Sequence, residues 1–272
     1  MNKLPQDAHI LDRIVAKKKL EIAASKKRIS SIRLEESELF SRECYSLKEF
    51  TQGADSTGII AEFKRASPSK GIINHHSTIK NTTEGYVWAG ATALSVLTDS
   101  DFFGGSYIDL ITARKYSKIP ILRKDFMLDE YQLLEAKAWG ADIILLIATI
   151  LHPDEIIKMA ALAKSLGLGV LLEVHNQREL ERSLCDDLDA VGINNRNLND
   201  FSVSLDHSYK LVSMIPDQFL KVSESGISNP KTIRELKEAG FTNFLIGESF
   251  MKEDDPAKAM EQFVSQIYGS DE

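Results

Sequence analysis

Hydrophobic and polar positions along the chain fall into two alternating kinds of segment. Short runs rich in Ile, Val and Leu have the composition of strands buried on both faces, and the longer stretches between them carry apolar residues at helical spacing. Eight runs are predicted to be strands, at residues 58–63, 93–98, 120–126, 142–147, 169–174, 190–194, 219–224 and 243–247.

Helices fit the gaps between these strands. The segments 128–139, 154–166 and 230–239 are each followed directly by a glycine, at Gly140, Gly167 and Gly240. Glycine adopts the left-handed conformation that ends many helices. The alternation, with no linker-like segment, predicts a single (β/α)8 TIM barrel domain over residues 1–272. An open doubly wound sheet is disfavoured because no GxGxxG follows the first strand.

Residues 1–56 are expected to form a helical N-terminal extension packed on the barrel. The first helix has one apolar face, and its lysines fall largely elsewhere. The apolar positions are Ile10, Leu11, Ile14, Val15 and Ile22, and the lysines are Lys17, Lys18, Lys19, Lys26 and Lys27. A basic amphipathic helix is also found on membrane surfaces, but docking on the barrel is the favoured interpretation.

Composition and charge exclude several classes of function. With 43% hydrophobic and 27% charged residues the chain has the composition of a globular protein. The net charge of −7 argues against nucleic-acid binding, although a small anion can still meet a locally positive pocket. The longest apolar run, near residues 143–150, is too short to span a bilayer, so no membrane association is expected.

Cysteine and histidine usage gives no sign of a metal. Cys44 and Cys185 are far apart and form no CxxC pair, which suits a reducing cytoplasm rather than a disulfide framework or a zinc site. The adjacent His75 and His76 are interpreted as polar loop residues. We therefore expect a cytoplasmic protein with no metal and no cofactor.

Polar side chains gather at the predicted strand ends, which in a barrel meet at one rim. Glu62 and Lys64 are two residues apart and share a face, and Lys124 shares its face with apolar neighbours. The other strand ends supply Glu173, Asn194, Glu224 and Ser225. Lysines beside carboxylates in a partly closed mouth act as acids or bases. Arg65 points the other way and is expected to be a solvated charge.

The last two strands are followed by glycine-containing segments, Ser225-Gly226-Ile227 and Gly247-Glu248-Ser249. Barrels often bind phosphate with backbone N–H groups at these two places. The pattern indicates a phosphorylated small-molecule substrate. The GxxxxGK[ST] loop is absent, so nucleotide hydrolysis is not supported.

The motifs that carry these residues resemble the indole-3-glycerol phosphate synthase family of tryptophan biosynthesis. They are "IIAEFKRASPSKG" (59–71), "VLTDSDFFGGS" (96–106), "ILRKDF" (121–126), "LLEVH" (171–175), "GINNRNL" (192–198), "SESGI" (223–227) and "LIGES" (245–249). The resemblance covers essentially the whole chain, which ends soon after the eighth unit, as in the monofunctional form. It implies a lyase that closes the pyrrole ring of 1-(2-carboxyphenylamino)-1-deoxyribulose 5-phosphate with loss of CO₂ and water, without a cofactor.

The resemblance also implies residue roles. Lys124 would protonate the carbonyl oxygen, and Lys64 and Glu173 would serve as acid and base in dehydration, with the assignment of each step left open. Glu62 would hold the lysines and Asn194 would orient a substrate hydroxyl. Glu224 and Ser225 would complete the rim.

Substrate binding is implied at a second set of positions. Ser67, on the "SPSKG" segment that we expect to be a mobile flap, lies near the anthranilate carboxylate, and Phe103 and Phe126 flank the aromatic ring. Arg196 belongs to the same substrate-binding set. Phosphate is expected on Gly226, Gly247 and Glu248, with help from Lys64. Some relatives carry a small hydroxyl residue at position 248, so the glutamate is harmless only if its backbone N–H makes the contact.

Two alternatives stay open: another phosphosugar-binding TIM barrel, such as an isomerase or epimerase, and an inactive barrel that binds a phosphate ligand. The first has no need for "EFKRASPSKG", and the second predicts a gap among Lys64, Lys124, Glu173 and Asn194, none of which is missing. We expect a monomer, with contact to other tryptophan-pathway enzymes as a further possibility.

Overall fold

A computed structural model describes residues 9–197 and 200–268, so the two ends of the expected domain and Leu198 of the "GINNRNL" motif lie outside the described residues. Its strands form a closed parallel barrel in which β1 pairs with both β4 and β10. The eight barrel strands are β1 (Ile59–Phe63), β4 (Ala93–Leu97), β5 (Ile121–Lys124), β6 (Ile143–Ile147), β7 (Gly169–Val174), β8 (Ala190–Asn194), β9 (Leu220–Glu224) and β10 (Asn243–Ile246). The predicted TIM barrel is confirmed.

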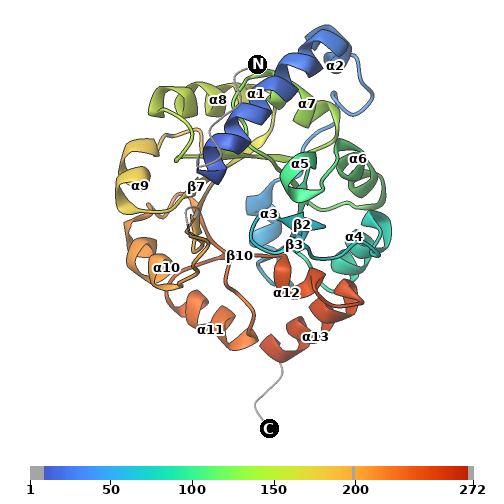
Figure 1. Cartoon of the computed structure of the whole chain (residues 1–272). Coiled ribbons are helices and arrows are strands. Elements are labelled where there is room, and N and C mark those ends of the chain that lie inside the picture. Colours follow the sequence, from blue (N-terminus) through green and yellow to red (C-terminus); the bar gives the residue numbers. More distant parts are fainter. Residues whose placement is uncertain (1–8, 198–199, 269–272) are drawn as a thin grey trace.

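A helix follows each barrel strand, and together these helices form a ring around the sheet (Figure 1). They are α4 (Ile79–Trp88), α6 (Tyr107–Tyr116), α7 (Tyr131–Ala138), α8 (Pro153–Ser165), α9 (Gln177–Ser183), α10 (Asp206–Leu211), α11 (Pro230–Glu238) and α13 (Pro256–Tyr268). Shorter elements are α5 (Ser100–Phe103), α12 (Glu248–Met251) and the 3-10 turn η1 (Val212–Met214). Gly140, Gly167 and Gly240 have φ values of 86°, 74° and 107°, as expected for residues that end helices.

The strands are buried on both faces because their side chains alternate between two apolar layers. Leu122, Leu145 and Leu171 belong to the cluster inside the barrel. Ile121 and Ile144, one residue away from that set, belong to the cluster between the strands and the outer helices. This double burial explains why the strands appear in the sequence as nearly continuous apolar runs.

The N-terminal helices contact both ends of the barrel. They are α1 (Ile10–Arg28), α2 (Ser31–Glu35) and α3 (Leu47–Thr51). The first turns of α1 lie over the mouth, where Ile10, Leu11 and Ile14 line the main cavity (Figure 1). Leu47 packs into the interior cluster against residues that begin β4, β6, β8 and β9, so it closes the opposite end.

Lys18 differs from its expected place on the polar face of α1. Its side chain is 1% exposed and forms ion pairs with Asp99 at 3.0 Å and Asp125 at 2.9 Å. Burial alone would lower the pKa of Lys18, but the Asp125 and Asp99 carboxylates outweigh burial and raise it. A buried ammonium group is tolerated here because these two buried carboxylates and Glu21, at 2.8 Å on the same helix, compensate its charge.

Arg65 is also not a free solvated charge. Its guanidinium Nη2 lies 2.9 Å from Asp109 Oδ1 on α6, and the group stacks 4.7 Å from the centroid of the Phe63 ring. The segment after it forms a two-stranded hairpin of β2 (Ala66–Ser67) and β3 (Gly71–Ile72).

Among the described residues, none of the helices combines the length and the hydrophobicity needed to cross a membrane.

Candidate active site

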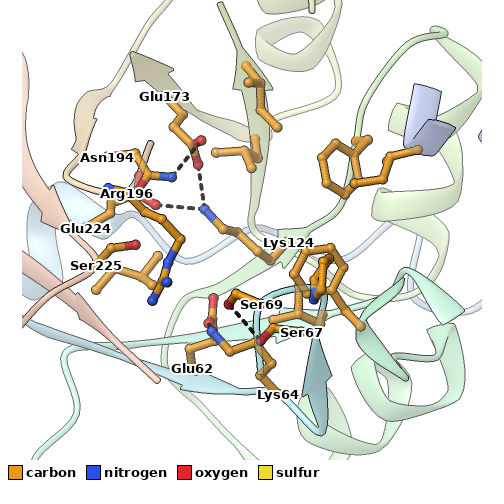
Figure 2. Close-up of a pocket in the computed structure, with 18 of the residues that line it drawn as sticks. Glu62, Lys64, Ser67, Ser69, Lys124, Glu173, Asn194, Arg196, Glu224 and Ser225 are labelled. Carbon is orange, nitrogen blue, oxygen red and sulfur yellow. Dashed lines mark hydrogen bonds and ion pairs between the residues drawn. The ribbon is translucent and has the colours of Figure 1, made fainter. Parts of the chain in front are cut away.

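The carboxyl ends of the barrel strands surround a cavity that residues of the β2–β3 hairpin, α5 and α1 also line, and Figure 2 shows its polar side chains. Twelve of the fourteen predicted site residues line it: Glu62, Lys64, Ser67, Phe103, Lys124, Phe126, Glu173, Asn194, Arg196, Glu224, Ser225 and Glu248. The other two, Gly226 and Gly247, line an adjoining pocket that shares Glu62, Lys64, Arg196, Ser225 and Glu248. The structure therefore brings the whole predicted set together.

Lys124, at the end of β5, lies at the centre of the polar side of this cavity. Its Nζ is 2.8 Å from Glu173 Oε2 and 2.7 Å from Glu224 Oε2, and Figure 2 shows the ammonium group between the two carboxylates. Burial would lower the pKa of Lys124, but the charges of Glu173, Glu224 and Glu62 outweigh it and raise that pKa. The raised pKa favours the charged ammonium form of Lys124.

The two carboxylates on Lys124 are not equivalent. Asn194 Nδ2 donates a hydrogen bond to Glu173 Oε1 at 3.0 Å, whereas Glu224 Oε1 is buried and has no hydrogen-bond partner among the described residues. Burial would raise the pKa of Glu173, but Lys124 and His175 lower it below the usual range. Burial and the charge of Glu173 raise the pKa of Glu224 despite the attraction of Lys124. The surroundings of the two carboxylates therefore shift their pKa values in opposite directions, below the usual range for Glu173 and above it for Glu224.

A second lysine–carboxylate pair lies on β1 and just after it. Lys64 Nζ is 2.8 Å from Glu62 Oε1, and the Ser95 hydroxyl donates to Glu62 Oε2 at 3.2 Å. A Cβ atom at Gly247 would lie 2.7 Å from Glu62 Oε1, and one at Gly192 would collide with Oε1 of Glu224. Glycine at these two positions leaves room for the carboxylates.

The opposite side of the cavity is apolar. The rings of Phe103 and Phe126 lie with their centroids 5.9 Å apart, beside Leu97, Leu145 and Ile147. Such a wall suits a flat aromatic group, because aromatic rings favour offset or tilted contacts at this separation.

The adjoining pocket is formed by the segments after β9 and β10. Ser225 and Gly226 have φ values of 67° and 78°, and the Ser249 hydroxyl donates to the Ile227 carbonyl at 2.8 Å, which joins the two segments. Arg196 Nη2 and Lys70 Nζ lie 3.2 Å and 3.6 Å from the Glu248 carboxylate. Positive side chains thus surround the place where phosphate is expected, and the Glu248 carboxylate lies among them.

Sequence reasoning missed several residues that shape this site. Asn195 is buried, and its amide donates to the carbonyl oxygens of Glu224 at 3.0 Å and Ser225 at 3.2 Å. These bonds hold the end of β9, where Ser225 adopts a positive φ. The only sequence signal was an asparagine beside a predicted strand end. The apolar face of α1 predicted docking, but not that its first residues would form part of the cavity wall.

The described residues contain no group of three or more His, Cys, Asp or Glu side chains arranged to hold a metal ion. His75 and His76 are exposed, and their rings stack on each other with centroids 3.9 Å apart.

A closed (β/α)8 barrel with a lysine–carboxylate cluster at its mouth belongs to the TIM-barrel enzymes. Solved structures agree on this fold: thiamine phosphate pyrophosphorylase from Pyrococcus furiosus matches with a TM-score of 0.56 at 19% identity, over 78% of this chain and 96% of that one. A chain of the tryptophan synthase α2β2 complex from a hyperthermophile, Pyrococcus furiosus, matches with a TM-score of 0.56 at 14% sequence identity. The match covers 77% of this chain and 97% of that one.

The family model of indole-3-glycerol phosphate synthase matches residues 11–263, and the chain belongs to this family. The indole-3-glycerol phosphate synthase of Bacteroides thetaiotaomicron is 45% identical over 258 residues, which cover 95% of this chain and 98% of that protein. The protein of the same name from Polaromonas sp. is 43% identical over 265 residues, 96% of this chain and 99% of the relative. The family resemblance is confirmed: the chain is a lyase of tryptophan biosynthesis that acts by decarboxylation on a phosphorylated small molecule.

Proposed function

We propose that the cavity catalyses ring closure, decarboxylation and dehydration of 1-(2-carboxyphenylamino)-1-deoxyribulose 5-phosphate through Lys124, Lys64 and Glu173. One observation carries the proposal. Lys124 Nζ, paired with Glu173 and Glu224, lies in a cavity with an aromatic wall and an adjoining glycine-lined pocket. The substrate has the matching order of groups: an aromatic ring, a ketone and a phosphate.

Binding follows from that order. The aromatic ring packs on Phe103 and Phe126, with Ser67 near its carboxylate. Backbone N–H groups at Gly226, Gly247 and Glu248 bind the phosphate, and Lys64 and Arg196 contribute positive charge. The ketone then lies in the middle of the cavity, toward Lys124.

Ring closure requires the aromatic carbon that bears the carboxylate to attack the ketone carbon. Negative charge develops on the ketone oxygen, and the Lys124 ammonium group donates a proton to it. Departure of CO₂ leaves its bonding electrons in the ring system. The apolar wall lined by Phe103 and Phe126 favours this step, because loss of CO₂ removes a charge from the least polar part of the cavity.

Dehydration needs an acid for the departing hydroxyl and a base for the neighbouring C–H. Glu173 serves as the base, because its lowered pKa keeps it anionic. Lys64 serves as the acid and is held in place by Glu62 at 2.8 Å. Asn194 orients a substrate hydroxyl, and Glu224 and Ser225 complete the rim of the site.

A product assay tests this function. Purified protein is given the carboxyphenylamino-deoxyribulose phosphate, and indole absorbance and fluorescence are followed. Product is expected without added metal or cofactor. Folded protein that binds the compound without turnover would instead be an inactive phosphate-ligand barrel. Activity only on simpler phosphosugars would identify an isomerase or epimerase.

We further propose that residues 1–272 act as one domain and as a cytoplasmic monomer, with residues 1–56 as its extension. Support comes from the direct packing of α1 and α3 on the two ends of the barrel. Light scattering after size exclusion tests the monomer, and mixing with other tryptophan-pathway enzymes tests for a stable contact.

A further inference from the structure

His175 lies beside the base Glu173 and links it to a second carboxylate. It comes directly after β7, two residues beyond Glu173, so the two side chains share a face. Its Nε2 is 3.5 Å from Glu173 Oε1, and its Nδ1 is 3.4 Å from Glu179 Oε2 on α9. The imidazole is therefore placed between two carboxylates, one inside the active site and one behind it.

The imidazole is held firmly from the α9 side. Thr149 Oγ1 lies 3.2 Å from His175 Nδ1 and also donates to Glu179 Oε1 at 3.1 Å. The backbone N–H of His175 donates to Glu179 Oε2 at 2.8 Å. The side chains of His175 and Glu179 are only 13% and 12% exposed. By contrast, the buried Nε2 atom has no hydrogen-bond partner among residues 9–197 and 200–268, and it faces Glu173.

This arrangement accounts for the inequality of Glu173 and Glu224. Both carboxylates pair with the same Lys124 at nearly equal distances, 2.8 Å and 2.7 Å, so Lys124 does not distinguish them. Two other neighbours lie on the side of Glu173: the Asn194 amide and the His175 imidazole. The amide is neutral, so on this side the imidazole adds the charge, whereas the charge of Glu62 acts on Glu224 and raises its pKa.

The carboxylates around His175 favour its charged form. Burial by itself would lower the pKa of His175, but the hydrogen bond to Glu179 and the charges of Glu173, Glu179 and Glu224 raise it. These groups face the imidazole from β7, α9 and β9. The charged imidazole in turn lowers the pKa of Glu173.

We propose that His175 is a positioning residue that, clamped by Glu179 and Thr149, fixes Glu173 as the anionic carboxylate of the pair on Lys124. This inference rests on the proposed role of Glu173 as a base. It assigns a role within the site to a residue that lies outside the main cavity.

A side pocket gives His175 its own access to solvent. It is lined by Thr149, His175, Glu179 and the exposed His207, and it shares only Leu11, Asn194 and Arg196 with the main cavity.

Steady-state kinetics of His175→Asn and His175→Phe test the proposal. We expect kcat to fall roughly tenfold with KM within about twofold. The acid limb of the kcat profile should move to higher pH, because Glu173 loses a positive neighbour and its pKa rises. Glu179→Gln should move the limb in the same direction by less. His207→Asn, on the wall of the same side pocket, is the matched control and should leave the profile unchanged.

An NMR titration of the nitrogen-15-labelled imidazoles separates this proposal from the proposed function, because it needs no turnover. The midpoint of His175 should lie above the ordinary imidazole value of about 6.5, and Glu179→Gln should lower it. If the wild type makes no product but His175 titrates high, only the proposed function fails. The positioning role would be overturned by an active wild type in which His175 titrates at or below the ordinary imidazole value of about 6.5 and the His175→Asn profile matches wild type.

Discussion

Lys18 on the helix before the barrel places its ammonium nitrogen 2.9 Å from Asp125, the residue that follows Lys124. The same nitrogen lies 3.0 Å from Asp99, whose side chain caps the helix that carries Phe103. One buried lysine therefore ties α1 both to the end of β5 and to α5. The ion pairs of Lys18 therefore hold both the helix that carries Phe103, in the apolar wall of the site, and the strand end that carries Lys124.

Replacing Lys18 by methionine should destabilise the protein by about 3–5 kcal/mol, because two buried carboxylates lose their counter-charge. Urea unfolding at pH 7 measures the effect. Lys17→Met is the matched control. Lys17 pairs with Asp101 on the surface, where the two side chains are 54% and 44% exposed. Loss of this pair should leave the urea midpoint unchanged. Equal midpoints for the two variants would contradict the buried role of Lys18.

The stability difference between wild type and Lys18→Met should depend on pH. Burial would raise the pKa of Asp125, but Lys18 and Arg123 lower it below its unfolded value. A lowered carboxyl pKa stabilises the fold above the unfolded value, about 3.9, and this stabilisation is lost as the pH falls through the lowered folded value. Unfolding free energies of the two proteins, measured from pH 7 downward, should therefore begin to converge below about pH 3.9.

Lys124→Met should lower kcat by at least ~10²-fold with the fold largely intact, because the ketone oxygen loses its proton donor. Circular dichroism and the product assay measure both properties. Lys164→Met provides the control, since Lys164 pairs with Asp189 at 2.8 Å in a separate pocket beside the first residues of β6 and β7. Near-normal turnover of Lys124→Met would mean that the general acid is a different residue.

Glu173→Gln and Glu224→Gln should differ sharply although both remove a carboxylate beside Lys124. Glutamine resembles the protonated carboxyl, which is the form that the raised pKa of Glu224 favours. We expect a loss of at least ~10²-fold in kcat for Glu173→Gln and less than about tenfold for Glu224→Gln. Rate profiles from pH 5.5 to 9 test this ranking, and the reverse ranking would exchange the two roles.

Glu248→Gln should strengthen phosphate binding. The Glu248 carboxylate pairs with Arg196 and Lys70, so it competes with an incoming phosphate for both cations. Removing its charge should lower the inhibition constant of inorganic phosphate by up to roughly fivefold, the equivalent of about 1 kcal/mol. Glu253→Gln controls for net charge, because Glu253 pairs with the exposed Lys252 in the wild type. Weaker phosphate binding in Glu248→Gln would mean that the carboxylate supports the site instead of competing with it.

The fold was predictable because its signals are local. Each strand is an apolar run that both faces of the barrel bury, and helix ends such as Gly140 lie in the left-handed region. The site was predictable for a related reason: the ends of parallel strands meet at one rim, so strand-end residues such as Glu62 and Glu173 converge without any knowledge of side-chain packing.

What the sequence did not show depends on partners far along the chain. Lys18 looks like a solvent-facing lysine until the fold brings Asp99 and Asp125 to it. Arg65 likewise meets Asp109 on another unit of the barrel. The inequality of Glu173 and Glu224 depends on which oxygen atom meets which neighbour, and no pattern of residue types encodes that.

The glycine at position 192 limits how the pocket can be redesigned. A methyl group there would occupy the space of Glu224 Oε1, and one at Gly247 would press on Glu62. Libraries that aim to change the accepted aromatic ring should therefore leave both glycines untouched. They should instead vary Leu97, Leu145 and Ile147, which line the cavity without contributing a charged group.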